Sequence, residues 1–165
     1  MTYRVCFVCT GNICRSPMAE SVFHARVAEA GLAELVTVDS AGTGTGGWHE
    51  GEAADPRAAS VLGEHGYGTE HIARQFQSSW FPRLDLVIAL DTGHLKALRR
   101  HAPTEEDVRK IRLLRSFDPS AGDELDVPDP YYGDRDNFEE CLEMVEAAST
   151  GLLAAVLAEL EGRTA

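Results

Sequence analysis

The sequence predicts a single α/β domain built on a small, twisted parallel sheet of about four strands flanked by helices. Two observations carry this prediction. Short apolar runs typical of buried strands alternate along the chain with longer segments of helical periodicity, which is the order found in parallel sheets. The length of 165 residues suits one domain, and 44% hydrophobic with 25% charged residues is ordinary for a globular protein. We therefore expect residues 1–165 to form one domain.

The expected strands and helices follow one another along the chain. Strands are predicted at residues 4–9, 35–40, 84–90 and 111–114. Helices are predicted near residues 17–30, 56–65 and 92–101, and a long amphipathic segment at about 138–160 closes the chain. Asp55 and Pro56 form an N-cap and first-turn pair for the second helix. In a sheet of this kind, ligands bind beyond the carboxyl ends of the strands.

The first strand runs into C-T-G-N-I-C-R-S, residues 9–16, a pattern typical of a phosphate-binding loop. Five residues between a cysteine and an arginine can wrap with their N–H groups turned inward, which makes an anion-binding nest. The guanidinium of Arg15 matches two phosphate oxygens, and Cys9 is the expected nucleophile because the same donors favour its thiolate. The alternative is a buried strand cysteine followed by an ordinary turn. The residues expected to form the loop are Thr10, Gly11, Asn12, Ile13, Cys14, Arg15 and Ser16.

The residues after the loop predict a helix that supports the same site. Ser16 is a good N-cap residue, and Pro17 fits the first helical position. The loop would then lie between the end of a strand and the N-terminus of a helix, where the helix dipole also favours an anion.

A second signal is D-P-Y-Y-G at residues 129–133, in a polar loop before the final helix. Cleavage of a phosphate ester needs a proton for the leaving oxygen, and a carboxylic acid on a loop can deliver it. Asp129 is the expected acid if this loop folds over Cys9, and Tyr131 and Tyr132 would then form an aromatic wall. Alone, these residues are equally typical of a turn. Beside the Cys9 loop they favour an active site.

Charge and cysteine content limit the class of protein. Fifteen basic and 27 acidic residues give a formal charge of −12, which argues against general binding to nucleic acid or to an anionic membrane. No apolar stretch is expected to approach membrane length, and the N-terminus shows no secretory signal. The four cysteines are therefore expected to be reduced in the cytoplasm, with secretion without a signal peptide left open. The six histidines show no metal spacing, and neither a metal nor a cofactor is expected.

Together these motifs resemble those of the low-molecular-weight protein tyrosine phosphatases. The resemblance runs from V-C-F-V-C-T-G-N-I-C-R-S-P-M-A-E through D-S-A-G-T, W-H, D-P-R-A and H-I-A-R to D-P-Y-Y-G-D. It implies Cys9 as nucleophile, Arg15 as phosphate ligand and Asp129 as general acid. The implied reaction is metal-independent hydrolysis of phosphotyrosine proteins or small aryl phosphates through a phosphocysteine intermediate.

The resemblance also implies supporting roles around the loop. Ser16 would hydrogen-bond the sulfur of Cys9, and Asn12 would brace the loop in a network that includes Ser40 and His71. Trp48 would line the substrate cleft, the alternative being a core or surface-loop tryptophan.

Three other functions are weighed against this one. A thiol-dependent arsenate reductase shares the loop but needs further cysteines in a mobile segment, and residues 80–100 contain none. A protein-arginine phosphatase is the closer rival. That branch has threonine where this chain has Ile13, and it lacks the pair Tyr131 and Tyr132. A phosphotyrosine-binding adaptor has no need for a nucleophile, a phosphate-binding arginine and an acid together.

Several points stay open from the sequence. Cys14 is either a redox partner that forms a disulfide with Cys9, as the resemblance implies, or an unreactive thiol. Asp91 either faces the cleft or caps the helix that follows it. The oligomeric state is unknown, with a monomer as the default, and phosphorylation of Tyr131 or Tyr132 is a hypothesis that rests on their expected exposure.

Overall fold

The computed structural model describes residues 2–44 and 49–164. Four parallel strands form one sheet in the order β2-β1-β3-β4. The strands are β1 (Tyr3–Cys9), β2 (Val36–Gly42), β3 (Leu86–Ala89) and β4 (Ile111–Leu113). The helices are α1 (Arg15–Glu29), α2 (Pro56–Glu64), α3 (Thr92–His101), α4 (Glu105–Arg109) and α5 (Arg135–Thr164), with 3-10 turns η1 (Ser78–Arg83) and η2 (Leu114–Phe117). The α/β class, the parallel sheet and its four strands are therefore confirmed.

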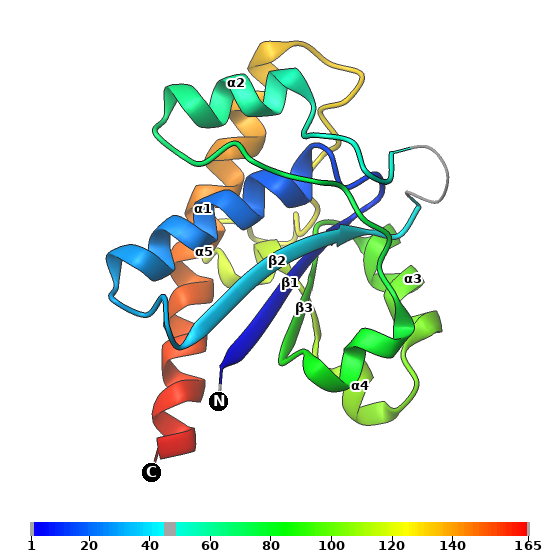
Figure 1. Cartoon of the computed structure of the whole chain (residues 1–165), viewed down its shortest axis with the longest axis vertical. Helices are drawn as coiled ribbons and strands as arrows, with labels where there is room; N and C mark the ends of the chain where they lie inside the picture. The colour runs from blue at the N-terminus through cyan, green and yellow to red at the C-terminus, as the bar shows by residue number, and fades with distance from the viewer. Residues whose placement is uncertain (1, 45–48, 165) are drawn as a thin grey trace.

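Helices cover both faces of the sheet, with α1 and α5 on one side and α3 and α4 on the other (Figure 1). Both faces of the sheet carry apolar side chains that need cover, because the side chains of strand β1 alternate between the two faces. Val5 and Phe7 join the core beneath α1 and α5, whereas Cys6 and Val8 join the smaller core beneath α3. On the larger side, the ring of Phe7 meets that of Phe23 from α1 edge to face at 5.7 Å.

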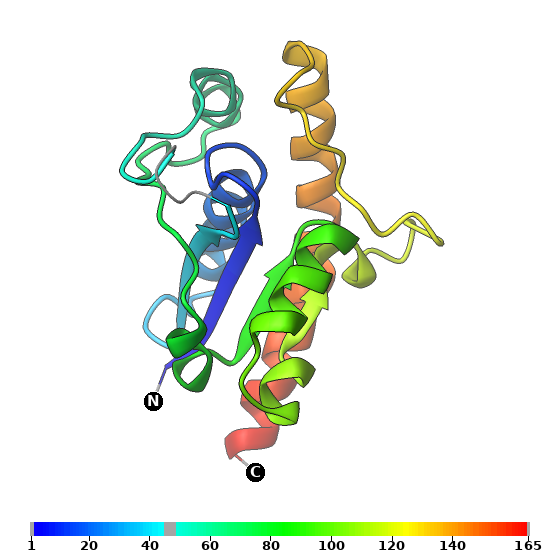
Figure 2. The same ribbon diagram turned by 90° about the vertical axis from the view of Figure 1, so that its right-hand side faces the viewer.

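The order of the strands places a crevice at the end of β1. The chain passes from β1 to β2 on one side and then to β3 on the other, so the connections diverge at the carboxyl ends of β1 and β3. Ligands bind at such switch points in open parallel sheets. Figure 2 shows the carboxyl ends of β1 and β3 leading into loops at the same end of the molecule.

Of the two predicted helix caps, one is present and the other is not. Asp55 accepts the N–H of Arg57 at 2.9 Å and caps α2, as predicted. Helix α1, however, begins at Arg15 with Cys14 in the N-cap position and without a side-chain cap. The prediction that Ser16 caps this helix is wrong, because its hydroxyl is directed to the loop instead.

Strand β3 is shorter than predicted. It begins at Leu86 rather than at residue 84, since Leu84 ends the turn η1. Asp85 accepts the N–H of Arg4 through its side chain and donates its own N–H to the carbonyl of Arg4. The apolar run therefore predicts a strand that is longer than the observed one.

Helix α5 corrects a second expectation. It contains an 18-residue window of mean hydropathy 1.6, so by length and composition it could cross a membrane. The expectation that no apolar stretch approaches membrane length is therefore wrong for this helix. The reason for its apolar character is visible in the fold, because one face of the helix lies in the larger core against α1, α2 and η2. That face consists of Phe138, Cys141, Leu142, Val145, Ala148, Leu152 and Val156.

Candidate active site

The loop between β1 and α1 turns on Asn12, which is fully buried and has a left-handed backbone with φ of 56°. Asparagine tolerates this conformation better than most residues. Its Nδ2 donates to Ser16 Oγ at 2.8 Å and to Ser40 Oγ at 3.0 Å, and its Oδ1 accepts the N–H of Arg74 at 3.0 Å. Its carbonyl oxygen lies 2.6 Å from Nε2 of His71. Asn12 thus joins three separate segments, which are its own loop, strand β2 and the segment of residues 71–74.

The sulfur of Cys9 lies 2.9 Å from Oγ of Ser16. The N–H of Arg74 identifies Oδ1 of Asn12 as the acceptor, so the Nδ2 group of Asn12 must donate to Ser16. The hydrogen of the Ser16 hydroxyl has two acceptors in reach, the sulfur at 2.9 Å and the carbonyl of Ala41 at 3.4 Å, and the sulfur is the nearer. A hydroxyl that donates to sulfur stabilises the thiolate over the thiol.

The carbonyl groups of the loop point outward into the surrounding frame. Those of Cys9, Thr10 and Ile13 accept the N–H groups of Thr43, Gly44 and Asp55 at 2.8, 2.9 and 2.8 Å. With its carbonyls bonded to the frame, the loop has its N–H groups left for the interior, as an anion-binding nest requires.

Arg15 is almost entirely buried, and two short hydrogen bonds from its Nη1 atom hold it. Nη1 donates to Oδ2 of Asp91 at 2.8 Å and to the carbonyl of Val127 at 2.9 Å. Asp91 also accepts the N–H of His94 at 2.9 Å and so caps α3. Although burial opposes its charged form, the amide of His94 and the guanidinium of Arg15 hold the pKa of Asp91 below its usual value. Of the two roles left open for Asp91, the structure shows the helix cap. The carboxylate also holds Arg15, but it is not among the residues that line the cleft described below.

Asp129 lies across the cleft from the loop. Its Oδ2 is 3.8 Å from Nη2 of Arg15, and its Oδ1 accepts the N–H of Tyr131 at 3.1 Å. Arg57 holds the same segment by donating to the carbonyls of Tyr131 and Gly133 at 2.9 and 3.0 Å. The segment D-P-Y-Y-G thus folds over the Cys9 loop, which was the condition set for Asp129 to act as an acid.

These groups line one cleft of about 430 Å³. Its floor contains Cys9 and Arg15, and its wall contains Asp129, Tyr131 and Tyr132. The two tyrosine rings meet edge to face at 4.9 Å, and Tyr132 is 91% exposed at the rim. The other lining residues are Thr10, Gly11, Ile13, Cys14, Gly44 and His49. A thiol, a guanidinium and a carboxyl beside aromatic rings match the chemistry of an aryl phosphate.

Comparison with known proteins agrees with this geometry. The sequence profile described as "Low molecular weight phosphotyrosine protein phosphatase" matches residues 4–162. The chain belongs to this family. It is 75% identical to the low molecular weight protein-tyrosine-phosphatase of Streptomyces coelicolor, over all of both chains. It is 50% identical to low molecular weight protein-tyrosine phosphatase A of Mycobacterium tuberculosis, over 90% of this chain and 88% of the relative.

The fold of this phosphatase agrees with solved members of the family. A crystal structure of a protein tyrosine phosphatase from Entamoeba histolytica superimposes with a TM-score of 0.90 at 34% identity. That match covers 96% of this chain and 99% of the other. The α/β architecture and the family predicted from the sequence are both confirmed.

Trp48, which was predicted to line the substrate cleft of this phosphatase, lies outside the described residues. Cys14 lines the cleft and is 5% exposed, and burial together with the nearby carboxylate of Asp55 raises the pKa of its thiol well above the usual value. All four cysteines are free, so a disulfide between Cys9 and Cys14 stays a prediction.

Sequence reasoning about this phosphatase missed two side chains. The sequence shows Arg57 only as part of a D-P-R-A motif, whereas in the structure it bridges Asp55 and the loop of Asp129. His94 was not singled out, although its ring lies 3.4 Å from Arg15. The alternation of apolar and polar residues does not reveal such contacts, since both residues meet their partners only through tertiary packing.

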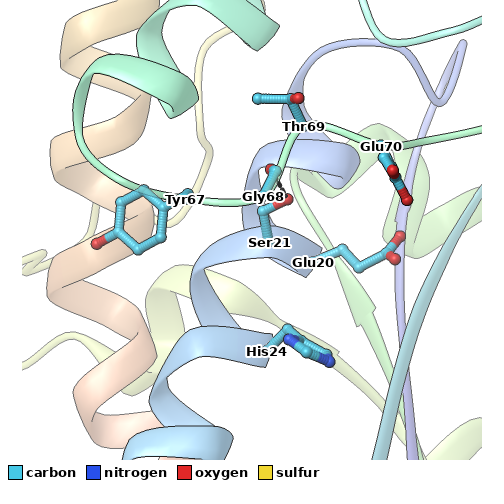
Figure 3. A pocket seen from close by; sticks show the side chains of 7 residues that line it. All are labelled: Glu20, Ser21, His24, Tyr67, Gly68, Thr69 and Glu70. Carbon is cyan, nitrogen blue, oxygen red and sulfur yellow. Dashed lines mark hydrogen bonds between the residues drawn. The ribbon is translucent and has the colours of Figure 1, made fainter.

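A second pocket, of about 540 Å³, lies between α1 and the segment after α2. Figure 3 shows Glu20 and His24 on the helix and Tyr67 and Glu70 on the facing segment. No cysteine or arginine lines it, and its two carboxylates would repel a phosphate group. The cleft at Cys9 is therefore the candidate active site. Within the described residues, no group of three or more His, Cys, Asp or Glu side chains could hold a metal ion.

Proposed function

We propose that this chain hydrolyses phosphotyrosine in proteins, and small aryl phosphates, through a phosphocysteine intermediate and without a metal ion. The observation that carries the proposal is the convergence of Cys9, Arg15 and Asp129 on one cleft with an aromatic wall. The names of its relatives, which are protein-tyrosine phosphatases, support it. A cytoplasmic location, where its four free cysteines stay reduced, is part of the proposal.

In the first step the thiolate of Cys9 attacks phosphorus in line with the ester bond. A sulfur–phosphorus bond forms as the bond from phosphorus to the phenolic oxygen breaks. The carboxyl of Asp129 gives its proton to that oxygen, so the product leaves as a neutral phenol.

In the second step water attacks the phosphocysteine. Asp129, now a carboxylate, takes a proton from the water as the sulfur–phosphorus bond breaks. Phosphate leaves and Cys9 returns to its thiolate, which the hydroxyl of Ser16 stabilises from 2.9 Å.

The charge on the phosphoryl group in both steps is met by the chain itself. Arg15 offers guanidinium N–H groups, and the loop offers backbone N–H groups at the N-terminus of α1. Donors held in place before the reaction stabilise a transition state more effectively than mobile water does. This arrangement is the physical basis for proposing catalysis without a metal.

Tyr131 and Tyr132 support the choice of an aromatic substrate. Their rings line the same cleft as Cys9, where they can flank the phenyl ring of a substrate. Ile13 is 7% exposed and contributes an apolar surface to the same cleft.

A panel of substrates tests the function. The purified protein is assayed with a phosphotyrosine peptide, a phosphoarginine peptide and arsenate plus thiol, with and without a chelator. We expect turnover of phosphotyrosine alone, unchanged by the chelator. Faster turnover of phosphoarginine, or loss of activity with the chelator, would overturn the proposal.

Two cysteine variants test the nucleophile. Cys9→Ser is expected to abolish turnover, because a serine hydroxyl is a much weaker nucleophile than a thiolate at neutral pH. Cys6→Ala is the matched control, since Cys6 lies on the same strand and faces the opposite core. Appreciable activity in Cys9→Ser, or an equal loss in both variants, would refute the role of Cys9.

A further inference from the structure

His94 is a buried histidine that lies against the catalytic loop. It is the third residue of α3, is 4% exposed, and has its Nε2 atom 2.8 Å from Oγ1 of Thr10 and 3.4 Å from Nη2 of Arg15. Its Nδ1 atom lies 3.2 Å from Oδ1 of Asp91 without forming an aligned hydrogen bond within the described residues. The ring of His94 therefore contacts Thr10 of the loop, Arg15, and the Asp91 carboxylate that holds Arg15.

The partners of the ring identify its protonation state. Arginine has N–H groups and no acceptor, so the Nε2 atom that faces Arg15 must carry no proton. The single proton then lies on Nδ1, facing the carboxylate of Asp91, and the hydroxyl of Thr10 donates to Nε2. Burial, together with the positive charge of Arg15, lowers the pKa of His94 to about 4, against the opposing effect of the nearby carboxylates. At neutral pH the ring is a neutral acceptor.

A count of the donors of Arg15 shows what this acceptor does. The guanidinium has five N–H groups in a fixed fork. Both hydrogens of Nη1 are directed to Asp91 and Val127, and one hydrogen of Nη2 faces His94. Within the described residues, Nε forms no hydrogen bond, and the second neighbour of Nη2 is Oδ2 of Asp129 at 3.8 Å, beyond hydrogen-bond distance. Nε and Nη2 lie on one edge of the group. This is the edge that binds two phosphate oxygens at once.

We propose that His94 is a positioning residue for Arg15: as a neutral acceptor it fixes Nη2 so that the edge formed by Nε and Nη2 faces the phosphoryl group. The inference rests on the proposed function, because it assigns the cleft to a phosphate. It extends that function by making a residue of α3 a determinant of oxyanion affinity.

Charged groups surround His94 on each side. Arg15 faces it from the loop, Asp91 from the start of its own helix, and Asp129 from the loop that carries the proposed acid. Asp126, whose carboxylate accepts the N–H of Thr92 at the start of α3, faces it from a fourth segment. Protonation of the ring would place an N–H against the N–H groups of Arg15 and would release Nη2. Affinity for an oxyanion should therefore fall in acid as His94 becomes charged.

Two substitutions separate positioning from packing. His94→Gln places a side-chain oxygen near the position of Nε2 and can still accept from Nη2, whereas His94→Leu has a similar volume and no acceptor. His101→Leu is the control, because His101 is an exposed histidine at the end of the same helix. The measurements are the inhibition constant of inorganic phosphate, together with kcat and KM for p-nitrophenyl phosphate from pH 4 to pH 7.5.

His94→Leu is expected to weaken phosphate binding about tenfold or more, the effect of losing one hydrogen bond to a charged group. His94→Gln should stay within about threefold of the wild type and should flatten the acid side of the profile. Equal effects of the two substitutions, or unchanged phosphate affinity in His94→Leu, would overturn the role of His94.

A measurement on the wild-type protein guards against a variant that does not fold. Nitrogen-15 NMR of the histidine rings reports which ring nitrogen carries a proton. We expect a neutral His94 with its proton on Nδ1 at pH 6, and a change in its signals when phosphate is added. A charged ring, or a proton on Nε2, would refute the proposal. A wild-type protein that neither binds phosphate nor hydrolyses phosphotyrosine would instead overturn the proposed function.

Discussion

Oδ2 of Asp129 lies 3.8 Å from Nη2 of Arg15, although these residues belong to loops at opposite ends of the sequence. Each is fixed from behind. Arg15 is held by Asp91 and the carbonyl of Val127, and the loop of Asp129 is held by Arg57. A carboxyl and a guanidinium placed in this way can act on the same phosphoryl group from two directions.

The role of Asp129 predicts a dependence on the leaving group. Asp129→Ala should lower kcat for phenyl phosphate about 10²–10³-fold, because general acid catalysis contributes effects of this size. The loss for p-nitrophenyl phosphate should be much smaller, since nitrophenolate leaves without a proton. Steady-state rates with both substrates test this, and equal losses would contradict Asp129 as the acid.

Arg57 is predicted to act through the loop of Asp129. Its guanidinium donates to Asp55 and to the carbonyls of Tyr131 and Gly133, and it lies 4.6 Å above the ring of Phe138. Arg57→Ala should therefore reproduce part of the dependence on the leaving group seen in Asp129→Ala, with a loss of about tenfold for phenyl phosphate.

Arg135→Ala is the matched control for Arg57. Arg135 also joins α2 to α5, and within the described residues its guanidinium bonds to Ser60, Glu64 and Glu139 rather than to the carbonyls of the Asp129 loop. It should leave the ratio of the two substrates unchanged. A similar change in both variants would mean that Arg57 acts only on stability.

Asn12 is predicted to be needed for both its conformation and its side chain. Asn12→Gly keeps the left-handed backbone but loses the three side-chain bonds, whereas Asn12→Ala adds a backbone strain of about 1 kcal/mol or more. Both should lose activity, because Ser16 is released from its donor. Urea unfolding should rank Asn12→Ala below Asn12→Gly, and the opposite order would argue against strain at this residue.

Gly151 is predicted to be required where α5 crosses η2. A Cβ atom at this position would overlap the backbone carbonyl oxygen of Phe117, so Gly151→Ala must push the two elements apart. We expect destabilisation of about 1–3 kcal/mol, the usual result of overpacking a core. Gly162→Ala on the same helix is the control. No atom of the described residues lies within 4 Å of its Cβ position, so this change should be neutral or slightly stabilising. Equal effects of the two would refute the close contact.

His94 also predicts a dependence of stability on pH. Its pKa is lowered from 6.5 to about 4, chiefly by burial, so between these values the unfolded chain binds a proton that the folded protein does not. The free energy of unfolding should therefore fall as the pH falls through this window, by up to about 3 kcal/mol.

His94→Gln should remove this component of the pH dependence. Denaturant unfolding of both proteins at pH 4.5, 5.5 and 7 measures the slope. Carboxyl groups of lowered pKa, such as Asp107 and Asp118, act at lower pH and are common to both proteins. Parallel slopes for the two proteins would show that His94 does not resist protonation.

The sequence predicted the local features of the chain correctly without knowledge of the fold. The strand that ends at Cys9, the C-T-G-N-I-C-R-S loop and the capping pair Asp55 and Pro56 depend on neighbouring residues, and local sequence encodes them well. The ends of elements were less certain. Strand β3 begins two residues later than the sequence predicts, and the hydroxyl of Ser16 bonds to Cys9 instead of capping a helix. In both places, hydrogen bonds formed in the folded protein outweigh the local preference.

The sequence alone thus determined the fold class, the family resemblance and the phosphate-binding loop, since each follows from residues close together in the chain. Only the tertiary structure decided how the distant parts meet. It brought Asp129 to Arg15, placed Arg57 beneath the acid loop and set the neutral ring of His94 against the guanidinium. The physical reason is that burial and hydrogen-bond geometry between distant segments set these contacts, and neither leaves a periodic pattern in the sequence.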